Sequence, residues 1–558
     1  MSRRPPASVL VALLLVLVLA GGAAAVAVIT GPAGAQGRGT TASANGVRRT
    51  GRLEPAAPIS FTLLLRAAHG RRLQRALDAV ENPRSPRFRS FIDARSFGAQ
   101  FGLSRAALAQ LRAVLARDGL TVTAGYPQRT ALTVRGTAGS VGRLLGVRFA
   151  TYADAAGDRW HAPLGRARLP VQLQRYVSHL AGLSSRPVYH PADGVPLSGL
   201  TPTTAADAYD VAALHSAGFL GQGMKIAIVS FSDYDRGDPS VFDQHYGLGG
   251  PPPQVISVDG GADSDAGADE ANLDIDVVKM IAPDAQILFY EAPASGSSYP
   301  DVINRIVADH QVSIISSSWG SCEAQTDPSV LTANEQALKA ATAAGISMFV
   351  ASGDSGAYDC QASDLADHQL TVDSPAASAY AVAVGGTRLN TSPSGSYESE
   401  SGWDDPLSNA GGGGGYSTFD SRPSWQAGPG VNTAIDKRGV PDVSADADQA
   451  TGWSTYDAGN WGQAGGTSAA TPFWAASMLL VQQYADSRHV GRIGFADPIL
   501  YALAQGGQPY PPFHDVTAGS NRYYAAHAGW DPATGLGSPD VYNLARDVVA
   551  YLQHHPGG

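Results

Sequence analysis

ISMFVASGD, residues 346–354, is a short run of apolar residues that ends in a glycine-containing turn. Similar runs in the same part of the chain are MKIAIVSF (224–231), AQILFYEA (285–292), VSIISSSWG (312–320) and AYAVAVGG (379–386). Helix-like stretches lie between several of them. Apolar strands that alternate with helices indicate a parallel sheet covered on both faces. We therefore predict an α/β domain with its chemistry beyond the carboxyl ends of the strands, where SSSWG and ASGDSG lie.

The 558 residues of the chain are too many for one ordinary core. Strand-like runs such as ISFTLLLR (59–66) and RTALTVRGT (129–137) alternate with helical patterns at 69–83 and 104–119, the second opening at a Ser104 cap. This favours a small α+β domain over residues 56–183. A Pro- and Gly-rich linker (184–199) follows it, and the larger domain spans 200–558. Residues 36–55 are expected to be a disordered leader.

The first 35 residues have the pattern of an export signal. Arg3 and Arg4 precede the apolar run Val9–Ile29, and Ala33-Gly34-Ala35 resembles a cleavage site. Because the run is also just long enough to span a bilayer, an uncleaved membrane anchor is the alternative. Either way we expect an exported, extracellular protein.

The charge is divided unequally along the chain. Residues 51–190 hold 21 arginines against 7 acidic residues, whereas residues 191–558 hold 13 basic against 42 acidic residues. The predominance of acid argues against nucleic-acid binding. Two domains held together partly by charge is the interpretation we favour, and independent surface composition is the alternative.

GGTSAATP, residues 465–472, places Ser468 at the expected start of a buried helix. A serine hydroxyl needs a partner to take its proton. None of the histidines of the larger domain stands in a glycine-flanked strand-to-helix context, although a triad assembled in space stays open.

DEANLDIDVVKMIAP (269–283) offers a carboxylate pair instead. Its apolar residues form one helical stripe, and Glu270 and Asp274 are four residues apart, on one face of the predicted helix. Two such carboxylates repel each other unless one is protonated or something lies between them. Alone, the pair is most simply a solvated helix face.

The order of the motifs changes this interpretation. DEANLDIDVV, SSSWG, ASGDSGAYDC and GGTSAATP occur in that order, and together they resemble the sedolisin family of serine-carboxyl peptidases. The resemblance implies a subtilisin-like catalytic domain preceded by an activation pro-domain of ferredoxin-like type. It implies Ser468 as nucleophile, Glu270 as general base and acid, Asp274 as its orienting partner and Asp354 at the oxyanion hole. Such carboxyl groups work in acid.

The same resemblance implies a calcium site near the C-terminus. FHDVTAGSN (513–521) and AGWDPATGLGSP (528–539) look like the family's calcium loop. The ligands would be the carboxylates of Asp515 and Asp531 and the carbonyls of Val516, His527 and Gly529, a mixed oxygen set that suits Ca²⁺. His527 stands where the family often has glycine.

Three further predictions concern the cleft. Cys322 and Cys360 are the only cysteines, and in an exported chain we expect one disulfide between them. Trp319 is a candidate wall of the substrate cleft, with a core tryptophan as the alternative. Asp373 is a candidate for the first specificity pocket, where it would favour a basic side chain.

The predicted protein is a secreted, acid-acting endopeptidase made as an autoprocessed precursor. Its partners would be protein or peptide substrates and its own pro-domain, and we expect a monomer. The alternatives are a tripeptidyl aminopeptidase of the same family, distinguished by a closed cleft end, and a catalytically silent surface-binding protein on this fold.

Overall fold

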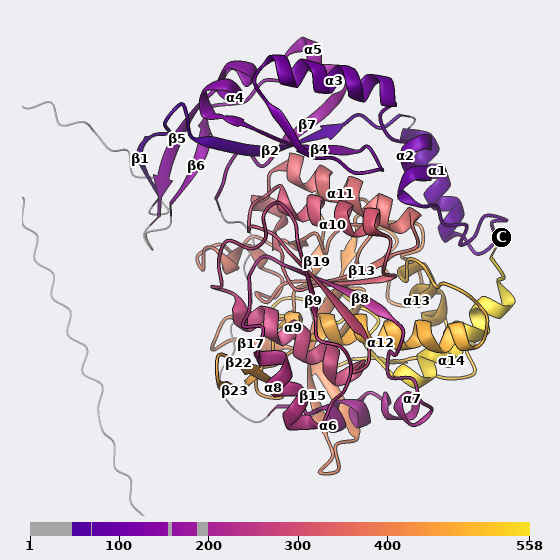
Figure 1. Ribbon diagram of the computed structural model, residues 1–558. Coiled ribbons are helices and arrows are strands. Elements are labelled where there is room, and N and C mark those ends of the chain that lie inside the picture. The colour runs from indigo at the N-terminus through magenta and orange to yellow at the C-terminus, as the bar shows by residue number, and fades with distance from the viewer. Residues whose placement is uncertain (1–46, 69, 155–158, 187–198, 558) are drawn as a thin grey trace, which may run out of the picture.

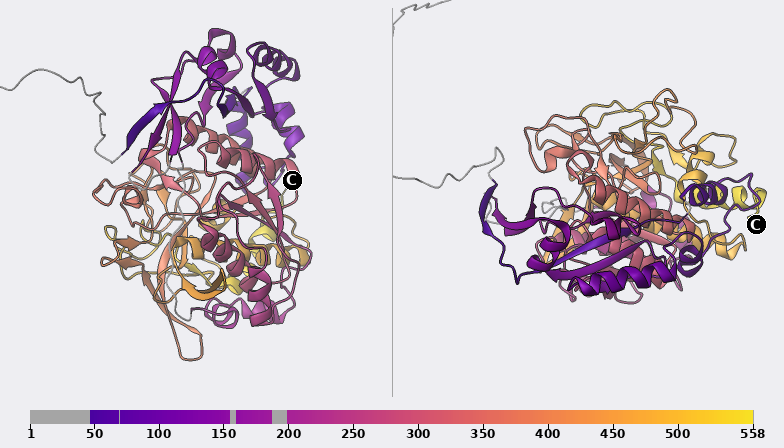
Figure 2. Two further views of the ribbon diagram at one scale, coloured as in Figure 1. Left: turned by 60° about the vertical axis from the view of Figure 1, so that its left-hand side comes forward. Right: turned by 90° about the horizontal axis from the view of Figure 1, so that it is seen from above.

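The computed structural model describes residues 47–68, 70–154, 159–186 and 199–557. The predicted export segment (1–35), part of the leader and most of the linker lie outside these residues. Within the described residues, no helix is both long and apolar enough to cross a membrane. The two predicted domains stack one above the other in Figure 1 and in the left view of Figure 2.

The larger domain is built on an eight-stranded sheet in the order β16-β15-β13-β11-β8-β10-β9, with β21 paired to β15. All of these pairings are parallel except that of β15 with β16. The predicted parallel sheet is therefore confirmed. The strands are β8 (Lys225–Ser230), β9 (Gln254–Ser257), β10 (Gln286–Glu291), β11 (Ile314–Ser317), β13 (Ser347–Ala351), β15 (Val382–Thr391), β16 (Tyr397–Gly402) and β21 (Val443–Asp446).

Helices cover both faces of this sheet. Strand β8 shows the division, because Ile226 and Ile228 join one hydrophobic core while Ala227 and Val229 join the other. The first core contains α6 (Pro202–Ala208), α9 (Ala268–Ile281), α12 (Thr467–Ser487), α13 (Asp497–Ala504) and α14 (Val541–His554). The second contains α10 (Ser298–Asp309) and α11 (Pro328–Ala343). Shorter helices are α7 (Ala212–Ser216) and α8 (Asp238–Tyr246).

The smaller domain has a four-stranded antiparallel sheet in the order β3-β4-β2-β7. Numbered along the chain within this sheet, the order is 2-3-1-4, as in ferredoxin-like folds. The sheet strands are β2 (Pro58–Leu65), β3 (Thr121–Ala124), β4 (Ala131–Thr137) and β7 (Val177–Ala181). The helices are α1 (Gly70–Glu81), α2 (Ala94–Gln100), α3 (Arg105–Arg117), α4 (Ala138–Leu145) and α5 (Val171–Gln174). The predicted Ser104 cap is present and accepts from the Ala107 N–H.

This sheet lies between its own helices and the larger domain. Along β2, Phe61 and Leu63 pack with α3 and α4, whereas Leu64 packs against Ala333 of α11. Alternate residues of a strand point to opposite faces. The smaller domain therefore covers α10 and α11 of the larger one (Figure 1).

The prediction that residues 36–55 are disordered is wrong for residues 48–52. Residues Arg48–Arg52 form strand β1, which pairs with β5 (Arg148–Ala153), and β5 also pairs with β6 (Arg159–Leu164). The pairing satisfies backbone groups of a strand that lies about 100 residues further along the chain, and local composition carries no sign of it.

Candidate active site

Helix α9 carries the predicted carboxylate pair into the interior. Glu270 is 1% exposed and Asp274 is fully buried. The expectation of a single apolar stripe is too narrow, because every residue from Glu270 to Ile281 is buried. The sheet, α12 and strand β22 (Trp453–Asp457) surround the helix. A solvated helix face is therefore excluded for this pair.

Ser468 lies in the first turn of α12 and is 2% exposed. Gly466 precedes the helix with φ of 83°, a backbone conformation that favours glycine. The Ser468 hydroxyl is hydrogen-bonded to the Glu270 side chain, and its oxygen also lies 3.4 Å from the Ser318 carbonyl oxygen. The structure thus joins the predicted nucleophile to the predicted base.

Burial dominates the electrostatics of the pair. It raises the pKa of Glu270 well above the usual value, with the nearby Asp274 as the second cause, while the Ser468 hydroxyl lowers it. Burial also raises the pKa of Asp274 to about 8, against a hydrogen bond from Ser318 that lowers it. Two carboxyl groups in this setting titrate as a coupled unit.

Asp354 follows β13 at the carboxyl edge of the sheet. The backbone N–H and the hydroxyl of Thr467 both donate to Asp354 Oδ1, at 2.7 and 2.9 Å. Burial raises the pKa of the Asp354 carboxyl. A protonated Asp354 could donate a hydrogen bond through its other oxygen, beside the first N–H groups of α12.

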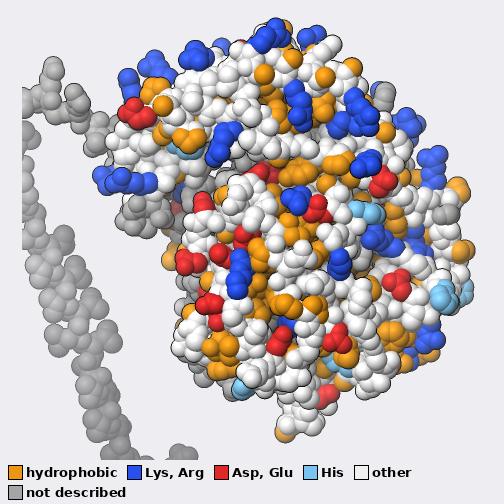
Figure 3. Space-filling view, viewed as in Figure 1, with side chains coloured by type: hydrophobic (Ala, Val, Ile, Leu, Met, Phe, Trp, Pro, Cys, Tyr) orange, Lys and Arg blue, Asp and Glu red, His pale blue; other side chains and the backbone are white. Residues whose placement is uncertain are grey.

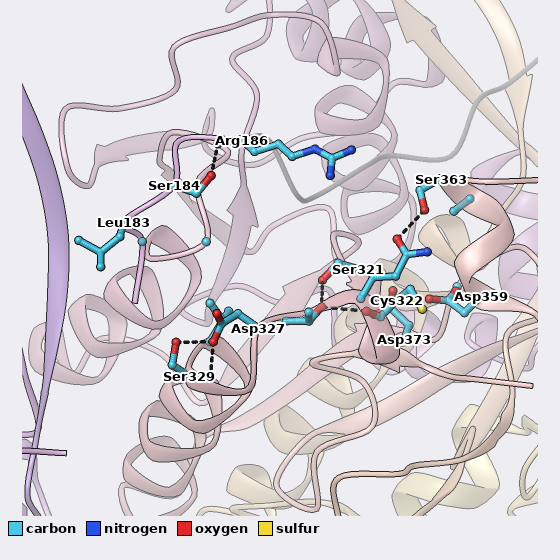
Figure 4. A pocket seen from close by; sticks show the side chains of 18 of the residues that line it. Leu183, Ser184, Arg186, Ser321, Cys322, Asp327, Ser329, Asp359, Ser363 and Asp373 are labelled. Atoms are coloured by element: carbon cyan, nitrogen blue, oxygen red, sulfur yellow. Dashed lines mark hydrogen bonds between the residues drawn. The ribbon is translucent and has the colours of Figure 1, made fainter. Parts of the chain in front are cut away.

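A cavity of about 740 Å³ opens onto this centre. Its wall includes Thr467, Ser468 and Asp354 from the larger domain, and Leu183 and Arg186 from the end of the smaller one. Figure 4 shows Leu183, Ser184 and Arg186 on one side of the cavity, opposite Asp359 and Asp373. The chain that leaves the smaller domain therefore runs along the cavity that Ser468 also lines.

Acidic groups line one end of the cavity. Asp373 is 6% exposed, and its pKa is raised well above the usual range by burial first and by Asp359 second. Burial also raises the pKa of Asp359, to about 8. Cys322, which also lines the cavity, forms the predicted disulfide with Cys360.

Trp319 does not line the cavity. It is 3% exposed and packs edge-on against Phe231, with ring centroids 5.7 Å apart. Its ring also approaches Gly267, where an added Cβ would lie 2.7 Å from Trp319 Cη2. The ring thus packs beneath the start of α9, as the core alternative expects, and a substrate-binding role for Trp319 stays a prediction.

The C-terminal loops bring the predicted calcium ligands together. The Gly529 N–H donates to Asp515 Oδ2 at 3.1 Å, and the His527 N–H donates to Asp531 Oδ2 at 2.8 Å. Gly529 has φ of 73°, whereas the backbone of His527 is not left-handed, so histidine is tolerated there. Among the described residues no cluster of three or more His, Cys, Asp or Glu side chains could hold a metal. A site here would need backbone carbonyls, and the two carboxylates and three carbonyls fit Ca²⁺ chemically.

Sequence reasoning missed two groups at the centre. Ser318 follows β11 and donates to Asp274 Oδ1 at 2.5 Å, yet it was one of three consecutive serines with nothing to single it out. Asp359 lies in the cavity wall beside Asp373. Its position five residues after Asp354 was the only available signal.

Comparison with known proteins agrees with this geometry. Residues 45–186 match the family described as "Pro-kumamolisin, activation domain", and residues 260–492 match the subtilase family. Kumamolisin from Bacillus sp. (strain MN-32) is 33% identical over 529 residues, which cover 88% of this chain and 92% of kumamolisin. The chain belongs to the sedolisin family of serine-carboxyl peptidases.

Other relatives extend the family comparison. Sedolisin from Pseudomonas sp. (strain 101) is 30% identical over 87% of this chain and 86% of its own length. Tripeptidyl-peptidase 1 from Bos taurus is 25% identical over 89% of this chain and 93% of its own length. The solved structure of Pseudomonas sedolisin with pseudo-iodotyrostatin superposes with a TM-score of 0.56 at 30% identity, covering 65% of this chain and 99% of that one. The larger domain of this sedolisin-family chain is thus a subtilisin-like peptidase domain, and the smaller one is its pro-domain.

Proposed function

We propose that this protein is an exported endopeptidase that acts in acid and is made as a precursor that cleaves itself. The observation that carries the proposal is the buried contact between Ser468 and Glu270, with Asp274 behind it and Asp354 beside it. Ser468 and Asp354 line the cavity, and Glu270 and Asp274 are buried behind Ser468. The intact set argues against a catalytically silent protein on this fold.

The proposed chemistry assigns each group one task. The Ser468 oxygen attacks the peptide carbonyl while its proton passes to Glu270, and Glu270 later returns a proton to the leaving amine. Asp274 orients Glu270 and shares its charge. Protonated Asp354 and the Ser468 N–H donate to the carbonyl oxygen as it gains negative charge.

The carboxyl groups set the direction of the pH dependence. Asp354 donates only while it is protonated, and burial raises its pKa, so the donor is present in acid and is lost as pH rises through the raised pKa. Glu270 must be ionised to accept the Ser468 proton, so protonation of the Glu270–Asp274 pair sets the acid limit of activity. The active range then lies between protonation of this pair and ionisation of Asp354.

The cavity supports a preference for basic side chains. Asp373 and Asp359 lie together in its wall, and Asp373 Oδ1 is buried without a hydrogen-bond partner. A lysine or arginine side chain would supply the missing donors and the opposite charge. We assign Asp373 to the pocket for the residue preceding the cleaved bond.

The pro-domain would inhibit by occupying this cleft until it is cut. Leu183 and Arg186 already line the cavity, and the residues that follow them connect to the peptidase domain. Processing within residues 187–198 would release the cleft. Calcium held by the 515–531 loops would stabilise the peptidase domain without taking part in the reaction, since those loops contribute no group to the cavity wall.

The experiment that tests this function compares two substrate classes over pH 3–7. We expect the processed wild type, but not Ser468→Ala, to cut blocked internally quenched peptides, fastest in acid. Cleavage restricted to tripeptides from free N-termini would instead favour the tripeptidyl-peptidase alternative. Activity that rises steadily to pH 7 would contradict acid action.

A further inference from the structure

Ser318 lies between the carboxyl pair and the nucleophile. Its hydroxyl oxygen is 2.5 Å from Asp274 Oδ1 and 3.1 Å from the carbonyl oxygen of Ser468. The residue is 4% exposed, so water does not compete freely for either contact. The Ser318 carbonyl oxygen in turn lies 3.4 Å from the Ser468 hydroxyl.

The Ser468 carbonyl is available because of a proline. In an α-helix the carbonyl of residue 468 would accept from the N–H of residue 472. Residue 472 is proline, which has no N–H, and it lies inside α12. The proline in SAATP therefore leaves one helix carbonyl without its usual partner, and the Ser318 hydroxyl reaches it.

A serine hydroxyl has one proton and here faces two acceptors. When Asp274 is ionised, the short contact to its oxygen takes that proton, because hydrogen bonds to charged acceptors are the stronger ones. When Asp274 is protonated, its own O–H can donate to the Ser318 oxygen, and the Ser318 proton can turn to the Ser468 carbonyl. The two states differ in which acceptor the single Ser318 proton serves, and the change needs only a rotation of the hydroxyl.

We propose that Ser318 is a positioning residue of the serine-carboxyl centre: its hydroxyl steadies the negative charge on Asp274 and turns to the Ser468 carbonyl when the pair takes up its second proton. The inference rests on the proposed acid-acting peptidase. During attack the Glu270–Asp274 pair passes from one proton to two, as Ser468 gives its proton to Glu270. Ser318 therefore acts through Asp274 and does not touch the substrate.

The sign of the effect follows from the groups around the pair. Glu270 and Asp269 come from α9, Asp354 from the end of β13, Ser318 from the end of β11 and Ser468 from α12. Among them, the Ser318 hydroxyl lowers the pKa of Asp274. Without that hydroxyl the pair protonates fully at a higher pH, so activity begins to fall earlier as the solution is made more acid.

The test is the pH profile of kcat/KM for Ser318→Ala. We expect the acid limb of this profile to move about one pH unit toward neutral. The substitution should therefore lower kcat/KM, relative to the wild type, roughly tenfold more at pH 3.5 than at pH 6. Ser316→Ala is the matched control, because it removes a buried hydroxyl without a hydrogen-bond partner from the same strand. Its profile should match the wild type.

Ser318→Thr keeps the hydroxyl and should restore the wild-type limb. If a variant matures too slowly to be purified, the pH dependence of precursor processing gives the same comparison. A Ser318→Ala profile lowered by one constant factor, or unchanged, would overturn the proposal. Failure of the acid optimum itself would appear in the wild-type profile, so the two outcomes are distinguishable.

Discussion

The Thr133 hydroxyl of the pro-domain donates a hydrogen bond to Asp301 Oδ2 of α10 at 2.8 Å. Thr62 donates to the same oxygen at 3.0 Å, and Asp301 is fully buried. Asp301 is also hydrogen-bonded to the carboxyl group of Asp259. Two carboxyl groups can share a hydrogen bond only if one of them carries a proton.

This contact predicts that pro-domain docking is proton-linked. Burial first, and Asp259 second, raise the pKa of Asp301 well above its usual value. Tyr126 also lies within electrostatic reach of Asp301 and Asp259, and of the Arg305 and Asp309 side chains. Once the pro-domain leaves, Asp301 becomes accessible and its pKa returns toward about 3.9. The stabilisation of the docked pro-domain is then complete below that pH and is lost as the pH rises. The docking constant falls by up to tenfold for each pH unit.

The measurement uses the full-length Ser468→Ala precursor, which cannot process itself. The unfolding temperature of its pro-domain should fall as the pH rises from 4 to 7. Adding Asp301→Asn should make this temperature less dependent on pH, since an amide stays neutral. Asp207→Asn, an exposed change on α6, is the control. Equal slopes with and without Asp301→Asn would refute the linkage.

The charges of the two domains have a smaller part in docking than their composition predicts. Basic side chains are spread over the outer surface of the pro-domain, with more acidic ones below (Figure 3). Between described residues, none of the ion pairs joins the two domains. Composition reports where charges are on the chain, whereas docking depends on which side chains face the partner. We therefore expect release of the pro-domain to depend on cleavage within residues 187–198 more than on the loss of charge attraction.

Glu270→Gln should reduce kcat/KM by at least about 10³-fold, because an amide cannot accept the Ser468 proton. Asp269→Asn is the neighbouring control, since Asp269 is exposed and only its charge reaches Glu270. Both variants are compared on the same blocked peptide at pH 4. A Glu270→Gln enzyme with more than a tenth of wild-type activity would exclude Glu270 as the base.

Asp354→Asn should retain more activity than Asp354→Ala. Thr467 donates twice to Oδ1, so the Asn side chain should place its oxygen there and its NH₂ where Asp354 donates. The Ala variant lacks the donor and should lose about 10²- to 10³-fold in kcat. Because an amide does not ionise, the Asn variant should also lose less activity between pH 5 and 7. The two kcat profiles, measured side by side, check this order.

Calcium binding is tested by comparing chelation with Asp531→Ala. Asp531 accepts from the N–H groups of His527, Ala533 and Thr534, so the substitution costs stability by itself. The informative quantity is therefore the change that a chelator causes in each protein. We expect the chelator to lower the Tm of the wild type and to leave that of Asp531→Ala unchanged. A wild-type Tm insensitive to both chelator and added Ca²⁺ would disprove the site.

The strands were accessible from sequence for a physical reason, whereas the roles of the reacting residues came from the resemblance to the sedolisin family. Parallel strands buried on both faces are continuous apolar runs, and their ends bring SSSWG and ASGDSG to one edge of the sheet. The burial of a helix by elements other than the sheet left no comparable signal in the sequence. Helix α9 has charged residues on several sides, and only the packing of α12 and β22 shows that Asp274 and Asp276 are both buried. Trp319 is a second case. The sequence left open whether its ring lies in the cleft wall or in the core, and only the packing shows that it is buried.

Asp373 should set a preference for arginine or lysine before the cleaved bond. In the empty cavity burial and Asp359 favour its neutral form, but a basic side chain would supply the charge that allows it to ionise. A charge-assisted contact of this kind is worth about 10- to 100-fold in selectivity. Paired peptides with arginine or leucine at that position, compared by kcat/KM, measure it. Asp373→Asn should bring the ratio close to one, mainly by slowing the arginine peptide. Asp364→Asn, an exposed change in the loop after Cys360, should leave the ratio as it is. If the wild type already cuts both peptides equally well, the pocket is not formed by Asp373, and the two buried carboxyl groups of the cavity wall serve its structure alone.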